Sequence, residues 1–179
     1  MHIENLKNKY LALESIHKFF YKAICVYIIW EFAYQFFLKN LTLDNYLIMN
    51  SVKRSKDLLN YFGYDVSSDF NLIAINNFRG VLITSECGIL PIMGFYIAYI
   101  FAYPVKYSIK FFYIIIGIIS LQLLNVLRIS ILTLTMAFFN NYWEFIHRAD
   151  SYIIFYPIIL ILWYSISTFH KNDFSLPDN

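Results

Sequence analysis

The sequence predicts an all-α integral membrane protein with about four transmembrane helices plus a bent or interfacial helix. A small extracytoplasmic helix and a β-hairpin are expected before the second span. Of the 179 residues, 59% are hydrophobic and only 15% are charged, whereas soluble domains are nearer half apolar and a quarter charged. The apolar residues form runs whose lengths compare with the ~30 Å hydrocarbon core of a bilayer. The net charge of +2 is small, so no nucleic-acid partner is expected.

The first apolar run, Phe19 to Leu38, has about 20 residues, enough to cross the bilayer at ~1.5 Å per residue. A cleaved signal peptide would need small residues at its cleavage site, and Phe32 to Phe37 offers one among aromatics. We therefore expect an uncleaved anchor. Glu31 shares a helix face with tyrosines and a glutamine, and an intramembrane carboxylate is costly. It would either bond to a neighbouring helix or pair with a cation.

The long polar region 39–88 is expected to be an extracytoplasmic insertion within a single domain covering 1–179. Its first part, Leu41 to Phe62, has the pattern of an amphipathic helix. Gly63 follows, and glycine often ends a helix.

Two β-branched runs follow this helix, Phe70 to Ile75 and Val81 to Thr84. They flank the Asn- and Gly-containing stretch 76–80, which predicts a β-hairpin. The second strand leads directly to Cys87.

Cys87 stands where this loop enters the first turn of the next apolar helix. The N–H groups of that turn have no internal partner and carry the positive end of the helix dipole, which favours a thiolate. Pro91 fits such a first turn. Cys87 is therefore a nucleophile candidate, preceded by Glu86. Cys25, inside the first span, is expected at a different depth, so both cysteines should be free thiols.

Three further apolar segments complete the chain. The stretch from Pro91 to Lys106 can span when tilted. Phe111 to Phe139 is ~43 Å long as one straight helix but too short for two spans, so a span to about Leu127 with a bent or interfacial continuation is expected. Asn140 to Asp150 is expected to be a polar loop, and Ser151 to Phe169 the last span.

Gln122, Asn125 and Arg128 are spaced i, i+3, i+6 within the segment Phe111 to Phe139. That spacing predicts one polar stripe on an otherwise apolar helix.

The charges predict an orientation. Four spans place both termini on one side, and the short segments there are rich in lysine, which marks it as cytoplasmic. Cys87 then begins the second span at its outer end. Arg128 lies about 27 Å up a helix that starts inside at Lys110, and His147 lies in the second outer loop. All three residues are therefore expected at one depth, near the outer surface.

These residues occur in recognisable motifs. A cysteine entering a membrane helix after a hairpin, then Asn125-Val126-Leu127-Arg128-Ile129, then Phe145-Ile146-His147-Arg148-Ala149-Asp150 before a final span, resembles the exosortase/archaeosortase family. The short length resembles the exosortase F type, and the similarity covers roughly Gly63 to Phe169. Two details differ from the common family pattern. Gly88 follows the cysteine directly, where the family commonly has Cys-Ser-Gly, and the aspartate lies three residues after the histidine.

The resemblance implies a membrane-embedded cysteine transpeptidase in a bacterial inner (cytoplasmic) membrane, multi-pass, with its site facing the periplasm or exterior. Its partners would be exported proteins with a C-terminal sorting signal and membrane helix, the lipid bilayer, and an amine or lipid acceptor. Cys87 would form a thioester acyl-enzyme. His147 would transfer protons, because imidazole gains and loses a proton near neutral pH. Arg128 would stabilise the oxyanion, with Asn125, Glu86 and Gln122 in supporting or substrate-binding positions.

Two other functions fit the same sequence. A non-catalytic membrane assembly or anchoring subunit of a surface-export system would not need Cys87. An intramembrane hydrolase would differ only in using water to resolve the thioester. A metal site from Cys87, Glu86, His147 and Asp150 lacks the spacing of known ligand motifs, so no metal or cofactor is expected.

Overall fold

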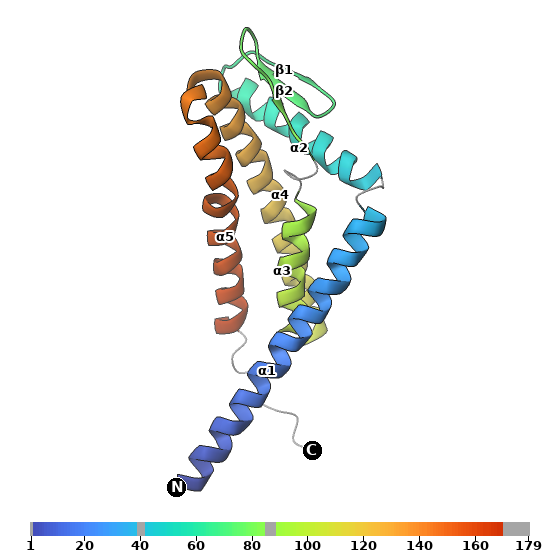
Figure 1. The fold of residues 1–179 in the computed structure, drawn as a ribbon, viewed down its shortest axis with the longest axis vertical. Helices are drawn as coiled ribbons and strands as arrows, with labels where there is room; N and C mark the ends of the chain where they lie inside the picture. Colours follow the sequence, from blue (N-terminus) through green and yellow to red (C-terminus); the bar gives the residue numbers. More distant parts are fainter. Residues whose placement is uncertain (1, 39–41, 85–88, 170–179) are drawn as a thin grey trace.

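The structure, a computed structural model, describes residues 2–38, 42–84 and 89–169. Long helices lie side by side, and a helix with a small sheet covers one end of them (Figure 1). This helix and sheet, residues 42–84, are called the cap. The start of α1 and the end of α5 both lie at the end opposite this cap. The elements are α1 (His2–Ala33) with a π-helical continuation (Tyr34–Leu38), α2 (Thr42–Tyr61), β1 (Val66–Asp69), β2 (Leu72–Ile75), β3 (Val81–Leu82), α3 (Leu90–Ala102), α4 (Tyr107–Phe138), a 3-10 turn (Asn140–Tyr142) and α5 (Trp143–Phe169).

α1 and its π-helical continuation together cover the predicted first span, Phe19 to Leu38, and α1 packs along α3. The Glu31 carboxylate accepts a hydrogen bond of 2.9 Å from Gln35 Nε2, one turn further along the same segment. This contact within one segment differs from both partners expected for Glu31, a neighbouring helix and a cation.

The cap confirms the predicted helix and hairpin. α2 ends before Gly63, whose φ of +87° suits glycine. β2 and β3 are antiparallel, as expected, and β1 adds a third strand in the order β1-β2-β3. β1 was not predicted because its sequence, Val-Ser-Ser-Asp, contains only one strong strand former. The apolar faces of α2 and the sheet meet the upper part of α4 in one buried cluster.

α4 is one uninterrupted helix, which corrects the expected bend or interfacial continuation after Leu127. The stretch 128–138 contains no Gly or Pro, the usual causes of a kink. Ile129 belongs to the cap's buried cluster, and Leu134 and Met136 pack against it. The part of α4 that exceeds the bilayer thickness is thus accommodated by packing against α2 and the sheet.

The expected polar loop from Asn140 to Asp150 is mostly helical, which corrects a second prediction. Only a short turn separates α4 from α5, which starts at Trp143. Polar residues do not by themselves indicate a loop, because these side chains interact at helical spacing. Arg148 pairs with Glu144, and Trp143 stacks on His147 with ring centroids 5.2 Å apart. Both are i,i+4 contacts of a helix surface.

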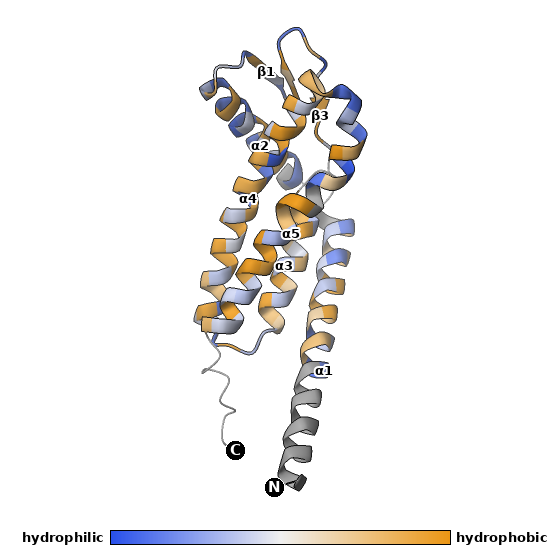
Figure 2. Ribbon diagram, turned by 90° about the vertical axis from the view of Figure 1, so that its left-hand side faces the viewer, coloured by the Kyte–Doolittle hydropathy of each residue, from blue (hydrophilic) through white to orange (hydrophobic). Residues whose placement is uncertain are grey.

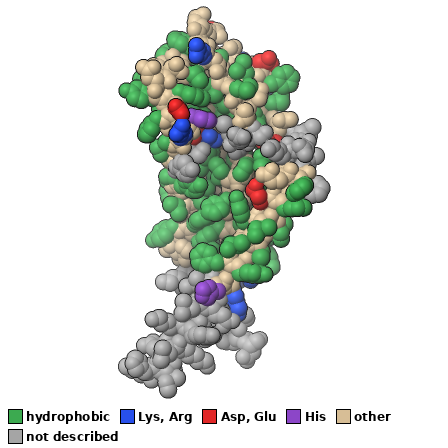
Figure 3. All heavy atoms as spheres, viewed as in Figure 1, with side chains coloured by type: hydrophobic (Ala, Val, Ile, Leu, Met, Phe, Trp, Pro, Cys, Tyr) green, Lys and Arg blue, Asp and Glu red, His purple; other side chains and the backbone are tan. Residues whose placement is uncertain are grey.

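Hydropathy follows this division of the fold. Hydrophobic residues run along α3, α4 and α5, and hydrophilic ones gather around α2 and the strands (Figure 2). On the face in Figure 3, hydrophobic side chains cover much of the middle, with most charged side chains above or below them. Within the described ranges, two helices are long and apolar enough to cross a membrane, α4 and α5 with its preceding turn, and α3 is a shorter apolar helix.

A glycine permits the close approach of α3 and α4. Tyr96 on α3 is buried, and its hydroxyl donates a 2.7 Å hydrogen bond to the Tyr113 carbonyl of α4. A Cβ built on Gly117 would lie 2.0 Å from the Tyr96 ring. Tyr96 thus lies level with Gly117 of α4. Leu90, the first residue of α3, is six residues before Tyr96 and so about 9 Å closer to the cap, which places the start of α3 beside the upper half of α4.

Candidate functional site

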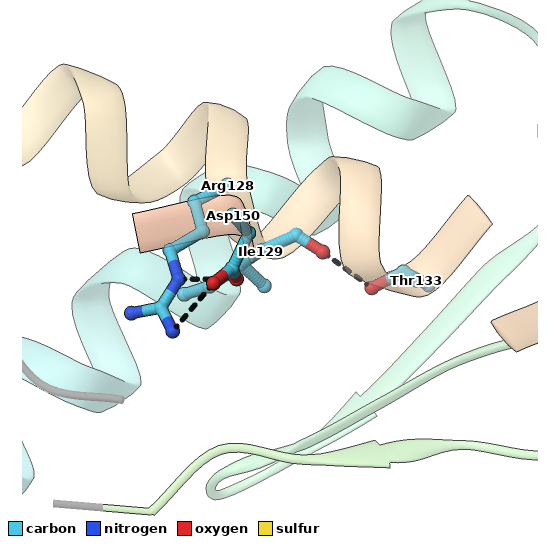
Figure 4. Close-up of polar contacts among 4 residues, drawn as sticks. All are labelled: Arg128, Ile129, Thr133 and Asp150. Atoms are coloured by element: carbon cyan, nitrogen blue, oxygen red, sulfur yellow. Dashed lines mark hydrogen bonds and ion pairs between the residues drawn. The ribbon is translucent and has the colours of Figure 1, made fainter. Parts of the chain in front are cut away.

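A buried ion pair joins α4 to α5 at the level where α2 packs on α4, between Val126, which bonds to Ser55, and Ile129, which belongs to the cap's buried cluster. Arg128 Nε donates to Asp150 Oδ2 over 2.6 Å, and Arg128 Nη2 lies 3.3 Å from Asp150 Oδ1. The two side chains are 5% and 1% exposed. Figure 4 shows the carboxylate against one edge of the guanidinium. Such a two-bond contact fixes the orientation of the arginine as well as its charge.

An aromatic ring borders the ion pair on the side away from the cap. The Arg128 Cζ atom lies 5.8 Å from the centre of the Phe155 ring, a cation–π distance. Phe155 also lines a cavity of about 400 Å³ between α1, α3 and α5. Its lining is Tyr27, Pro91, Ile92, Phe95, Phe155 and Tyr156. The ion pair thus lies where a polar cap meets an apolar bundle, surroundings in which electrostatic interactions are stronger than in water.

His147 lies on α5, one turn before Asp150 and therefore on the same side of that helix. The ring is half-buried, and its face packs against Trp143, nearly parallel to it. The buried Nδ1 atom has no hydrogen-bond partner among the residues described. Because Asp150 contacts Arg128, His147 and Arg128 belong to the same end of the α4–α5 pair.

Gln122 and Asn125 lie against α2. The Ser51 hydroxyl accepts from Gln122 Nε2 over 2.8 Å and from Asn125 Nδ2 over 3.2 Å. Ser55 adds a third bond between the helices, donating to the Val126 carbonyl over 3.0 Å. Both serines are fully buried. The two amides of the predicted stripe therefore help to hold α2 on α4, while buried Asn125 Oδ1 has no partner within the described chain.

Cys87 and Glu86 lie outside the described residues. The chain is well fixed just before them, because Ile83 is held by Asn71 through two hydrogen bonds. Ile83 N donates to the Asn71 carbonyl over 2.8 Å, and Asn71 Nδ2 donates to the Ile83 carbonyl over 2.9 Å. Just after them, Ile89 is buried in the same cluster as Phe155. Cys25 is a free thiol.

Sequence reasoning missed two partners at this site, Asp150 and Ser51. An intramembrane arginine needs a counter-charge, and Asp150 would have been the obvious choice if the segment around His147 had been taken as helical. Ser51 gave no such signal, because a serine on an amphipathic helix is equally common on its exposed face. Among the described residues, no group of three or more His, Cys, Asp or Glu could hold a metal ion.

The family model for transmembrane exosortases (Exosortase_EpsH) matches residues 15–164 of the chain. Neither the curated proteins nor the solved structures contain a match. The matched range runs from α1 to α5 and includes the ion pair, His147 and the segment that contains Cys87.

Proposed function

The chain belongs to the transmembrane exosortase family, and on that basis we propose that it is a membrane-embedded cysteine transpeptidase. Its substrates are exported proteins that carry a C-terminal sorting signal, a membrane helix and a basic tail. It cleaves near the signal through a thioester and passes the acyl group to an amine. The observation that carries this proposal is the buried Arg128–Asp150 pair one turn from His147, in a chain whose family acts within the membrane.

In the proposed first step, the Cys87 thiolate attacks the scissile carbonyl carbon and forms a C–S bond. The carbonyl oxygen then carries negative charge, which the Arg128 guanidinium stabilises. Asp150 engages the Nε and Nη2 edge of that group, so Nη1 lies on the opposite side. The carboxylate thus holds the guanidinium in one orientation before substrate binds, and such preorganisation is what lowers a reaction barrier.

In the remaining steps, His147 transfers protons. Its protonated ring gives a proton to the leaving amine as the C–N bond breaks and the thioester forms. The neutral ring then takes a proton from the incoming amine, which attacks the thioester and releases Cys87. Stacking on Trp143 restrains the orientation of the imidazole. Asn125 and Gln122 support the site indirectly, by keeping α2 against α4.

The proposal places the protein in the bacterial inner membrane with four spans. α4 and α5 supply two of them. α1 supplies another, since its exposed side chains include Phe20, Ile24, Ile28 and Phe32, a surface suited to lipid. α3 would be the fourth span. It is too short to cross ~30 Å alone, but the cap covers the end of the bundle where α3 begins. The cap would face the periplasm or exterior, as the lysine distribution predicts.

The test is processing of an exported protein with such a C-terminal signal, co-expressed with the chain in membranes. Cys87→Ser and Cys87→Ala should each abolish cleavage while membrane insertion and yield stay unchanged. Cys25→Ser is the matched control and should process normally. Mass spectrometry of the released product identifies the new C-terminus and any attached amine. Normal processing by Cys87→Ala would instead support the non-catalytic assembly subunit.

A further inference from the structure

An elongated groove lies on the cap, between α2 and the sheet. Two cavities form it, of about 490 Å³ and 770 Å³. Both are lined by Tyr46, Met49 and Phe70, so they meet at these side chains. One extends past Lys53 and Lys56 of α2, and the other extends to Ile83 and Thr84 at the end of β3. The walls of the groove are therefore both polar and apolar.

Phe70, at the meeting point, adopts a backbone conformation that is unfavourable for it. It occupies the two-residue turn between β1 and β2 with φ +49°, where glycine, asparagine or aspartate is usual. A bulky residue in this region costs free energy. Packing does not offset that cost, because Phe70 is 72% exposed. A strained and exposed aromatic side chain between two cavities is better explained by a ligand than by the fold.

The neighbouring edge of the sheet offers main-chain hydrogen bonds. β3 is an edge strand, paired with β2 through Val81 and Leu82. The bond from Ile83 N to the Asn71 carbonyl makes residues 71 and 83 a hydrogen-bonded pair. In an antiparallel ladder the next pair, which contains Leu82, is not hydrogen-bonded, so the N–H and C=O of Leu82 point away from β2. Such an edge accepts an extended peptide as an added strand.

We propose that this groove binds the extended polypeptide segment just upstream of the scissile bond, with Phe70 as the residue that contacts its side chains. This inference rests on the proposed function, because it takes Cys87 as the point of cleavage. The groove ends at Thr84, three positions before Cys87 in the sequence. A polypeptide lying along it would thus be led toward the nucleophile. The substrate's membrane helix would enter from the bilayer side. The segment that precedes this helix in the substrate would then lie against the cap.

The first test separates binding from folding. Phe70→Gly removes the ring and suits a positive φ, so the thermal midpoint should stay equal or rise. KM for processing should rise about 5- to 30-fold, the usual effect of losing one aromatic anchor, with kcat little changed. Asn77→Gly is the matched control, because Asn77 also has a positive φ, +70°, in the other turn of the sheet but lines neither cavity. It should leave KM unchanged, and an unchanged KM in Phe70→Gly would overturn the proposal.

The second test does not depend on catalysis. A photo-crosslinking benzoylphenylalanine is placed at position 70 in the Cys87→Ser variant, and the crosslinked peptide is identified by mass spectrometry. Capture of the segment upstream of the cleavage site supports the groove, even if the serine variant still processes substrate and the proposed mechanism fails. Capture of the substrate's membrane helix, of lipid or of a second copy of the chain would overturn it.

Discussion

Arg128 and Asp150, 22 residues apart in the chain, form an ion pair with 2.6 Å between Nε and Oδ2. The pair joins α4 to α5 at the level where the apolar bundle meets the cap. A buried pair contributes little net stability, because desolvation offsets the attraction. In the proposed mechanism the pair instead holds a cation in a fixed orientation where a substrate carbonyl would arrive.

Removing either partner alone should destabilise the protein. Arg128→Ala and Asp150→Ala each leave one buried charge unpaired, at a cost of about 3–5 kcal/mol. Thermal unfolding in detergent measures the loss. Arg128→Lys should impair processing nearly as much as Arg128→Ala, because an ammonium group lacks the planar fork that Asp150 engages. A near-normal rate in Arg128→Lys would reduce Arg128 to a structural role.

Replacing both partners separates stability from catalysis. The double variant Arg128→Met with Asp150→Leu removes the charges together, and its stability should return to within about 1–2 kcal/mol of the parent. Processing should remain absent, because no cation is left to stabilise the oxyanion. Processing restored together with stability would contradict a catalytic Arg128.

Ser51 is predicted to stabilise the contact between α2 and α4. Ser51→Ala leaves the half-buried Gln122 donor and the buried Asn125 donor without their acceptor, which should cost about 1–3 kcal/mol. Ser167→Ala, at a more exposed site on α5, is the control and should fall within about 0.5 kcal/mol of the parent. Equal midpoints for the two variants would show that the contact between α2 and α4 does not depend on Ser51.

Much of the cap followed from local sequence signals. α2, the stop at Gly63 and the β2–β3 hairpin depend on periodicity and turn residues, which act over a few positions. β1 escaped prediction because its Ser-Ser-Asp composition favours a turn and only pairing with β2 makes it a strand. The polar stripe on α4 was also predictable. The partners of its members were not, since Ser51 and Asp150 reach it from other helices.

The wrong predictions for α4 and α5 have different causes. The α4 prediction used the bilayer thickness as the limit of a helix, and the α5 prediction used polarity as the sign of a loop. α4 continues past that limit because the cap supplies an apolar surface for Ile129 and Leu134. α5 starts within the expected loop because Trp143 and His147, at i and i+4, stack on one helix face. Tertiary packing, which hydropathy does not report, decides where these helices begin and end.

Gly117 should not tolerate even a methyl group. Gly→Ala normally stabilises a helix by about 1 kcal/mol, but here the added Cβ would meet the Tyr96 ring at 2.0 Å. Tyr96 is restrained by its bond to the Tyr113 carbonyl, so Gly117→Ala should destabilise by about 1–3 kcal/mol. Thermal unfolding measures the sign. A stabilised variant would mean that α3 and α4 pack less closely than described.

Sidedness of labelling tests the orientation. A membrane-impermeant maleimide added outside intact cells should modify Cys87 and leave Cys25 unmodified, because the cap is predicted to face outward. Cys25→Ser and Cys87→Ser variants assign the label to one thiol. If Cys87 is labelled only when the reagent can reach the cytoplasmic face of the membrane, the predicted topology is wrong.

The central claim is that Cys87 becomes acylated by the substrate, and intact-mass analysis of the chain tests it most directly. When the substrate is supplied without an acceptor amine, the account predicts an adduct with the mass of the upstream fragment, mapped to Cys87 and released by hydroxylamine as a thioester is. Cys87→Ser should lack this hydroxylamine-labile adduct, and Cys25→Ser should retain it. Processed substrate that accumulates with no adduct on Cys87, or an adduct that maps to another residue, would contradict the account.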